Sequence, residues 1–521
     1  MKKIIALILI TGSILFNVSC TSWLKEEQFD KINSSIIYES PEGLATALNG
    51  LYSLNRRYYR FIDTPDTRAN YWFYCADDLG ITRTYNDANI YGPGMIAGNF
   101  YPDMWINGYQ LIDRSSAIIV NSRSVAMDAT AKNKLVAQAK VIRAMTYLRL
   151  LHVYDNILLD TIPTTSTNAF DPVEYKPATQ KQIYDLVNSD LDYAIATLPY
   201  KVDYGMIGLG LTKHLRAESA IWSGDYATAA ANADDIIANG GYALATADQV
   251  FGATSYVTSK EVIFPLPFNE LLGGSDNLAG GSGSPLGAAF QARYYEIKIP
   301  GQVNPIIEDN VYGGNAFGWN LPNDYLRSLY DEKVDKRMQF YYYPDVLIAN
   351  NPLSPIFGKP LTTPIPYSTN IREYHWSCMK YRDFVKSPGT AMSYKDKIMY
   401  RFAETLLLGA EAHWRIGGST DVKALQFINM IRTRAGVPGL TSIDLKAIMD
   451  EDARELSFEG KRWFFLKRIG KLVEQVNLYH YIGGTLGALT HKYVMDDHHT
   501  RWPIPQNQLD IMITFPQNPG Y

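Results

Sequence analysis

Two segments of the chain combine aromatic rings with amides or carboxylates, in stretches too rich in Gly, Asn and Asp to form regular elements. They are residues 84–91 (TYNDANIY) and 312–320 (YGGNAFGWN). The apolar face of a sugar ring packs on Tyr or Trp, while Asn, Asp and Arg hydrogen-bond its hydroxyls. The segments therefore indicate a carbohydrate-binding surface, and its candidate residues are Tyr85, Asn86, Tyr91, Trp319 and Asn320. The alternative for each is a side chain that packs only within its own loop.

Trp72 and Asp78 precede the first segment and are the next ligand candidates. Trp72 falls in a short stretch of helical character near residues 70–78, where an aromatic side chain is more often part of the core. Asp77 and Asp78 are equally suited to cap a turn through hydrogen bonds to backbone amides. Both alternatives stay open from the residues alone.

Two pairs of glutamates have the helical spacing that places both carboxylates on one face: Glu404 with Glu411, and Glu455 with Glu459. Hydrolysis of a glycosidic bond needs two carboxylates across a cleft, one of them with a raised pKa. Glutamates at helical spacing more often form ion pairs, and nearby partners include Arg401, Arg454 and Arg462. No hydrolase nucleophile motif, phosphate loop or dinucleotide fingerprint occurs in a fitting context. We therefore expect no catalytic residue and no cofactor.

Asp496, Asp497, His498 and His499 are consecutive and have side chains that can ligate a metal ion. They lie beside a proline-rich C-terminal tail, where a solvated loop is the simpler interpretation. We therefore expect no metal site in this segment.

Apolar residues at three- and four-residue steps predict four pairs of amphipathic helices. The pairs cover about residues 41–121, 131–198, 211–239 and 394–436. The third pair is most like a tetratricopeptide unit, because it has the small residues that close helix packing requires. In the fourth, Gly417 and Gly418 end one helix and Asp421 caps the next. The chain is expected to be mostly α with tetratricopeptide-like repeats; unrelated amphipathic helices are the alternative.

Residues 243–393 separate the third and fourth pairs and are rich in Gly, Pro and aromatic residues, with one clear strand at 261–264. Such a loop-rich insertion in a repeat scaffold is where binding is expected. Residues 445–470 are again helical, and an extended, proline-punctuated tail completes the segment 445–521. Three apolar residues of the tail are expected to pack against the repeats: Trp502, Ile504 and Phe515.

Residues 1–19 have the features of a secretory signal, a basic start and an apolar run too short to span a bilayer. The run ends in FNVSC, which resembles a bacterial lipobox, so we expect acylation of Cys20 and anchoring to a membrane. An ordinary cleavage site beside a chance cysteine is the alternative. Residues 20–40 form a polar tether before a single domain, residues 41–521. No other segment is long and apolar enough to cross a membrane.

Composition excludes several classes of protein. Hydrophobic residues make up 46% of the chain, which argues against disorder of the bulk. The formal net charge of -4 disfavours binding to nucleic acid. With Cys20 acylated, only Cys75 and Cys378 remain, and these can form one disulfide or stay free thiols.

Several separated stretches of the sequence each match a motif of the same protein family. They are residues 139–154 (AKVIRAMTYLRLLHVY), 211–244, 261–264 (EVIF), 400–412 (YRFAETLLLGAEA), 427–437 (FINMIRTRAGV), 453–471 (ARELSFEGKRWFFLKRIGK) and the ending RWPIPQ with QNPGY. Together they resemble the SusD/RagB nutrient-uptake lipoproteins of Bacteroidetes, over nearly the whole mature chain and in the family order. One departure is Phe464-Phe465-Leu466, which stands where many members have an Asp-Leu step.

This resemblance implies a SusD-like fold, with four repeat units packed against an irregular, ligand-facing portion. It also implies an outer-membrane lipoprotein on the cell surface, acting as the lid of a SusC-like TonB-dependent transporter. Lys25-Glu26-Glu27 resembles the tag that sends such lipoproteins to the outside. The expected function is capture of an oligosaccharide and its delivery to the transporter. The alternatives are capture of a peptide, as the RagB branch suggests, and a secreted glycoside hydrolase.

Overall fold

The computed structural model describes much of the chain after the N-terminal segment. The residues it describes are 37–63, 74, 76–82, 90–99, 102–252, 256–268, 284–343, 346–361, 370–385, 389–483 and 493–521. The signal segment and Cys20 lie outside this part. Within it the chain is mostly helical with a few short strands, which confirms the expected fold class. None of the helices found there is long and apolar enough to cross a membrane.

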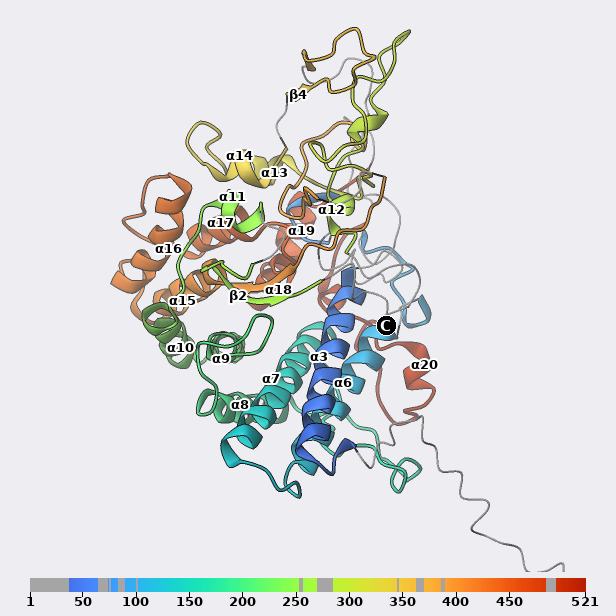
Figure 1. Cartoon of the computed structure of the whole chain (residues 1–521), viewed down its shortest axis with the longest axis vertical. Coiled ribbons are helices and arrows are strands. Elements are labelled where there is room, and N and C mark those ends of the chain that lie inside the picture. Colours follow the sequence, from blue (N-terminus) through green and yellow to red (C-terminus); the bar gives the residue numbers. More distant parts are fainter. Residues whose placement is uncertain are drawn as a thin grey trace, which may run out of the picture.

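Long helices pack side by side in sequence order and form the scaffold. They are α3 (Pro41–Asp63), α6 (Asp103–Asn121), α7 (Ala129–Tyr154), α8 (Gln180–Ile195), α9 (Leu209–Trp222), α10 (Tyr226–Asn239), α15 (Phe402–Gly417) and α16 (Val422–Ala435). Each contacts the next in this order, including α10 with α15, although the whole insertion separates those two in sequence. In Figure 1 they follow one another from the lower centre to the left. The chain therefore leaves the helix stack after α10 to form the insertion and returns to it at α15, and α10 and α15 still pack against each other.

Capping side chains and a glycine form the helix ends, as the residue types at these positions indicate. The Asp421 carboxylate accepts a hydrogen bond from the amide of Ala424 at 2.9 Å and begins α16. Gly418 ends α15 with a φ of 79°, a conformation that glycine adopts without strain. Before α3, the Ser40 hydroxyl accepts a hydrogen bond from the amide of Gly43 at 3.0 Å. Side chains thus satisfy amides that the helices leave unpaired.

The helix expected to begin near residue 394 begins instead at Phe402. The preceding residues Lys397–Arg401 form β6, which pairs antiparallel with β2 (Val262–Leu266). Met399 lies three residues before Phe402, a spacing that fits a helix, but it belongs to this strand and is buried there. The assignment was wrong because a short apolar run has no clear period of its own, and a distant partner strand takes its backbone hydrogen bonds.

A small sheet joins three distant parts of the chain. Its central strand β1 (Gly80–Thr82) pairs antiparallel with β3 (Asn320–Pro322) and parallel with β7 (Tyr481–Ile482). Strand β1 follows the N-terminal helix α3, β3 lies in the insertion, and β7 lies in the C-terminal part. The sheet therefore joins the stretch that ends at Thr82 to Asn320, the last residue of the second predicted ligand segment.

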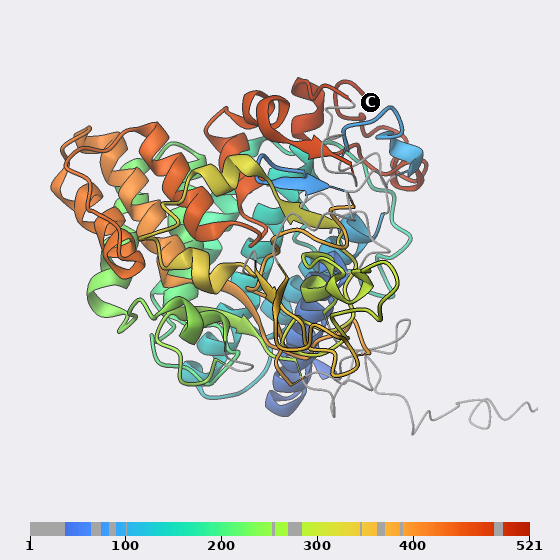
Figure 2. The same ribbon diagram turned by 90° about the horizontal axis from the view of Figure 1, so that it is seen from above.

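Short elements make up the insertion and the C-terminal part. Those of the insertion are α11 (Ala247–Phe251), α12 (Leu286–Ala289), α13 (Asp324–Ser328), α14 (Arg337–Tyr341), β4 (Leu347–Ile348) and β5 (Pro360–Leu361). Those after α16 are α17 (Leu445–Leu456), α18 (Arg462–Arg468), α19 (Leu472–Tyr479) and α20 (Gln506–Leu509). Seen from above, much of the insertion lies in front of the blue N-terminal helices, and the orange helices α15 and α16 lie to the left (Figure 2).

The C-terminal part differs from the expected single helix over residues 445–470. The chain leaves the helix between α17 and α18, where Phe458 has a φ of 61°. The tail packs back as expected, since Trp502, Ile504 and Phe515 are buried. The amide of Trp502 also donates to the carbonyl of Val153 at 2.9 Å, which fixes the tail to the end of α7.

Candidate functional site

Four of the predicted ligand residues lie in the described part of the chain. Tyr85, Asn86 and Trp72 lie outside it. Of the others, Tyr91, Asp78 and Asn320 are exposed over only 3%, 0% and 0% of their surface, whereas Trp319 is partly exposed. Among these four candidates, Trp319 is therefore the one whose side chain can face a ligand.

Trp319 stacks on Phe317, and the two rings form one aromatic surface. Their centroids lie 4.2 Å apart and their planes differ by 27°. Both side chains are partly exposed. In a stacked pair each ring fixes the orientation of the other, and the outer face of a ring stays available for an apolar contact. Trp319 is a predicted ligand residue, whereas Phe317 is not. The two aromatic residues on either side of Gly318 were the sequence feature that could have indicated Phe317.

The backbone holds this pair against the end of α12. The amides of Phe317, Gly318 and Trp319 donate in turn to the carbonyls of Ala288, Gln291 and Ala289, at 2.7, 2.8 and 2.9 Å. Gly318 between the two aromatics has a φ of 57°. A Cβ atom there would lie 3.2 Å from the backbone of Arg372. Glycine is therefore required both for the left-handed turn and for the close approach of the neighbouring chain.

Arg372 contacts the backbone of the aromatic pair, and its sequence neighbours Asn370 and Glu373 carry further polar groups. The Arg372 guanidinium donates to the carbonyl of Phe317 from Nη2 at 2.8 Å and from Nε at 3.3 Å. The Asn370 amide donates to the Glu373 carboxylate at 3.0 Å. All three of these side chains are partly exposed. The arrangement combines an apolar ring face with hydrogen-bonding groups at its edge, which a sugar ring needs from a binding surface.

Two of the buried candidates have structural partners. The Tyr91 hydroxyl donates to the carbonyl of Ala76, and its ring packs edge-on against His480 and His499. The Asn320 amide donates to the carbonyl of Tyr74, while its Oδ1 has no hydrogen-bond partner within the described residues. Neither side chain presents a face to solvent.

The third buried candidate, Asp78, lies in a cluster of acidic side chains around one arginine. Asp78 accepts two hydrogen bonds from Arg462, both at 2.9 Å, and Asp452 accepts a third at 2.9 Å. Burial, followed by the neighbouring Asp78 carboxylate, raises the pKa of Asp77 to about 7. The cluster fixes the stretch that leads into β1 rather than facing a ligand.

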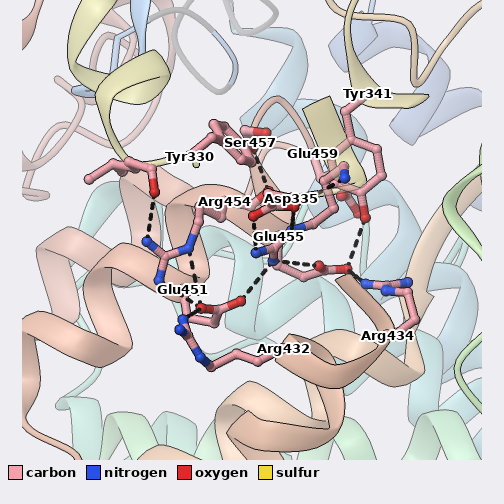
Figure 3. A network of polar contacts seen from close by, with 12 residues as sticks. Tyr330, Asp335, Tyr341, Arg432, Arg434, Glu451, Arg454, Glu455, Ser457 and Glu459 are labelled. Carbon is pink, nitrogen blue, oxygen red and sulfur yellow. Dashed lines mark hydrogen bonds and ion pairs between the residues drawn. The ribbon is translucent and has the colours of Figure 1, made fainter. Parts of the chain in front are cut away.

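The glutamates considered for catalysis are ion-paired. In the network of Figure 3, Glu455 pairs with Arg434, and it also contacts Arg401 at 2.7 Å and Arg337 at 3.2 Å. Glu459 contacts Arg401 and Lys380, each at 2.7 Å. Burial alone would raise the pKa of Glu455, but Arg434, Arg401 and Arg337 hold it well below its ordinary value. Both glutamates therefore stabilise the fold.

The other glutamate pair is ion-paired as well. Glu404 lies 3.0 Å from Lys461, and Glu411 lies 2.7 Å from Arg468. Against the effect of burial, Lys461 and His214 lower the pKa of Glu404 to about 2. Arg468 likewise lowers the pKa of Glu411. None of the four glutamates has the raised pKa that a general acid requires.

Asp496, His498 and His499 come together at the end of the chain, with ligand atoms within 4.8 Å of one another. The amide of Asp496 donates to Nδ1 of His499 at 3.1 Å, so that nitrogen of the ring is already engaged within the turn. Burial, followed by His498, lowers the pKa of His499 to about 4. Asp496 itself is 61% exposed and caps the short turn by accepting from the amide of His498. This geometry is that of a capped turn.

The remaining cysteines do not contribute a reactive site in the described residues. Cys378 is a free, buried thiol, and burial raises its pKa to about 12. Cys75 lies outside the described residues.

Comparisons with known proteins point to one family. A model of the SusD family matches residues 328–521, and a model described as starch-binding and associating with the outer membrane matches residues 22–209. SusD-like protein P2 of Formosa agariphila is 23% identical over 387 residues, which cover 70% of this chain and 71% of that protein. The starch-binding protein SusD of Bacteroides thetaiotaomicron is 28% identical over 151 residues, 28% of this chain and 26% of that protein.

Solved structures agree on the fold. A laminarin-binding SusD-like protein superposes with a TM-score of 0.72 at 21% identity, over 93% of this chain and all of that one. Surface glycan-binding protein A from Bacteroides thetaiotaomicron, solved in complex with laminarihexaose, has a TM-score of 0.68 at 20% identity. That match covers 92% of this chain and 99% of the other.

Proposed function

We propose that this chain, which belongs to the SusD/RagB family, captures a glycan on the surface formed by Phe317 and Trp319. It then delivers the glycan to a SusC-like TonB-dependent transporter. The observation that carries the proposal is the stacked aromatic pair, partly exposed and held by three consecutive backbone hydrogen bonds. A preformed surface of this kind loses little conformational entropy when a ligand binds.

A neutral or weakly charged sugar fits the groups around the pair. Arg372 contacts the backbone of the pair itself, and Asn370 and Glu373 supply further donors and acceptors beside it. These groups can hydrogen-bond several hydroxyls at different angles, while the rings cover one apolar face of the sugar. The glycan-binding proteins among the relatives and structural neighbours support the same ligand class.

The proposed place of action is the outer face of the outer membrane. Acylation of Cys20 and the segment Lys25-Glu26-Glu27 would tether the domain there, beside the transporter. The scaffold helices α3 to α16 would supply the docking face for the barrel, which leaves the insertion free to hold the nutrient. The match to a model named for association with the outer membrane supports this location.

Calorimetric titration of the mature chain tests this function. The ligands are laminarin, laminarihexaose, starch, maltoheptaose and a set of mixed peptides. Saturable binding of a glycan supports the proposal. Saturable binding of peptides with no binding of any glycan would replace it with the peptide-capture function. Release of reducing ends from a glycan by the purified chain would point to a hydrolase.

A further inference from the structure

A second cleft lies on the C-terminal side of the small sheet. Its volume is about 1120 Å³, and α13, α17 and α19 form its walls, with Ile81 and Tyr481 from the sheet at one side. These three helices are labelled close together in the centre of Figure 1. Ligand sites in proteins typically measure about 300 to 1,000 Å³, so the cleft can hold several sugar rings. Neither Phe317, Trp319 nor Arg372 lines it.

The cleft contains its own stacked aromatic pair. Tyr325 of α13 and Tyr479 of α19 have ring centroids 3.8 Å apart and planes that differ by only 8°. Both side chains are partly exposed and line the cleft. Burial, followed by the Asp78 carboxylate, raises the pKa of Tyr325, so its hydroxyl stays protonated and can donate a hydrogen bond. The pair repeats, on different elements, the ring arrangement of Phe317 and Trp319.

A buried acceptor in the wall of the cleft has no partner. Gln475 is only 8% exposed, and its Oε1 has no hydrogen-bond partner among the residues that the structure describes. It lines the same cleft as the tyrosine pair. An unsatisfied buried acceptor destabilises a fold by about 1 to 3 kcal/mol. Oε1 itself has almost no solvent-accessible surface, so a ligand hydroxyl would donate to it, and remove that cost, after the Gln475 side chain rotates toward the cleft.

The charges of the cleft indicate a neutral ligand. Lys446 and Asp450 form an ion pair at 2.6 Å, as do Lys471 and Glu474. The remaining charged groups of the lining are one acid and one base, Asp324 and Arg454. Because acidic and basic side chains balance, the cleft has no excess of one sign that would attract a polyanion or polycation.

We propose that this cleft is a second glycan-binding site, in which a sugar packs against Tyr325 and Tyr479 and donates a hydroxyl to Gln475. The inference rests on the proposed function for its choice of a glycan. With two sites on one chain, a polysaccharide can be held at two places along its length. Two linked contacts raise the apparent affinity for a long ligand above that for a short one.

Three variants test the site. Gln475→Leu removes the acceptor but keeps the volume of the side chain, and it should not lower the melting temperature because no partner is lost. Tyr479→Ala removes one ring of the pair, and Trp319→Ala alters the other site. Leu478→Ala is the control, since Leu478 is 51% exposed on the same helix and does not line the cleft. Each variant and the wild type are titrated with laminarihexaose, maltoheptaose, laminarin and starch.

We expect Gln475→Leu and Tyr479→Ala each to weaken binding of at least one polysaccharide by roughly five- to tenfold, from loss of one hydrogen bond or one ring contact. Leu478→Ala should bind as the wild type does. Wild-type affinity of both cleft variants for every glycan, with weaker binding by Trp319→Ala, would overturn the second site and leave the proposed function standing. Weaker binding by the cleft variants alone would support the cleft and refute the Trp319 surface. A wild-type chain that binds none of the four glycans would refute both proposals.

Discussion

Arg462 and Asp78 form a two-point ion pair, with Nε to Oδ1 and Nη2 to Oδ2 both at 2.9 Å, although 384 residues separate them in the sequence. Both side chains are almost completely buried. The pair joins α18 to the stretch that leads into β1, and β1 in turn pairs with the strand that follows Trp319. This contact therefore anchors the framework from which both proposed sites are built.

Asp78→Asn should lower the free energy of unfolding by about 3 to 5 kcal/mol, because it leaves the buried Arg462 charge with an incomplete partner. Urea unfolding followed by circular dichroism measures the change. Asp497→Asn is the control, because Asp497 pairs with Arg501 at 2.9 Å but is 88% exposed, and it should leave the unfolding midpoint unchanged. An equal effect of both substitutions would contradict the structural role of the buried pair.

Asp77 makes stability depend on pH in a direction that can be checked. Its pKa is raised to about 7 in the folded chain from an ordinary value of 3.8, so folding favours the protonated form. The stabilisation is complete below pH 3.8 and is lost as the pH rises through 7. Asp77→Asn keeps an acceptor for the amide of Leu79. We expect Asp77→Asn to be as stable against urea as the wild type near pH 4. At pH 8 the variant should unfold at a higher urea concentration than the wild type.

Glu404 should show the opposite dependence. Its pKa is lowered to about 2 from an ordinary value of 4.5, so folding favours the ionised form. The stabilisation is complete above pH 4.5 and is lost as the pH falls toward 2. Glu404→Gln should therefore be less stable than the wild type at pH 7, and the difference in melting temperature should shrink below pH 4. A difference that is constant with pH would show that the ion pair with Lys461 is not its source.

Gly318→Ala should disturb the aromatic surface without unfolding the chain. The substitution strains the left-handed backbone by about 1 to 2 kcal/mol and brings a methyl group against Arg372. Gly358→Ala is the matched control, since its φ of 75° imposes the same strain but a Cβ there meets no atom within 4 Å. We expect Gly318→Ala to lower the melting temperature somewhat more than Gly358→Ala, because of the added contact with Arg372, and to weaken glycan binding, measured by calorimetry, where Gly358→Ala does not. Equal affinities would show that the ring positions do not depend on the glycine.

Local chemistry allowed much of the fold to be predicted. The cap at Asp421 and the glycine at Gly418 depend on neighbours within one helical turn, so the sequence contains them directly. Strand β6 depends on β2, which lies on the far side of the insertion, and the local pattern at Met399 could not reveal that partner. Hence the helix start was placed too early.

Burial explains why some of the predicted ligand residues can face a ligand and others cannot. Tyr91 and Trp319 are both aromatic residues in loops, yet Tyr91 is enclosed by two histidines while Trp319 stays partly exposed against Phe317. Residue type and spacing do not determine which loop is covered by the rest of the fold. The second cleft was not predicted for the same reason, because Tyr325 and Tyr479 are far apart in the sequence and come together only in the folded chain.

The affinity of Trp319→Ala for a glycan tests the central claim most directly. The wild type, this variant and the control Phe357→Ala, which removes an aromatic that is 55% exposed elsewhere in the insertion, are titrated by calorimetry with the glycan that the wild type binds most tightly. The account predicts at least about tenfold weaker binding for Trp319→Ala, equivalent to about 1.4 kcal/mol, and no change for Phe357→Ala. Wild-type affinity in Trp319→Ala, with its melting temperature also unchanged, would contradict the account.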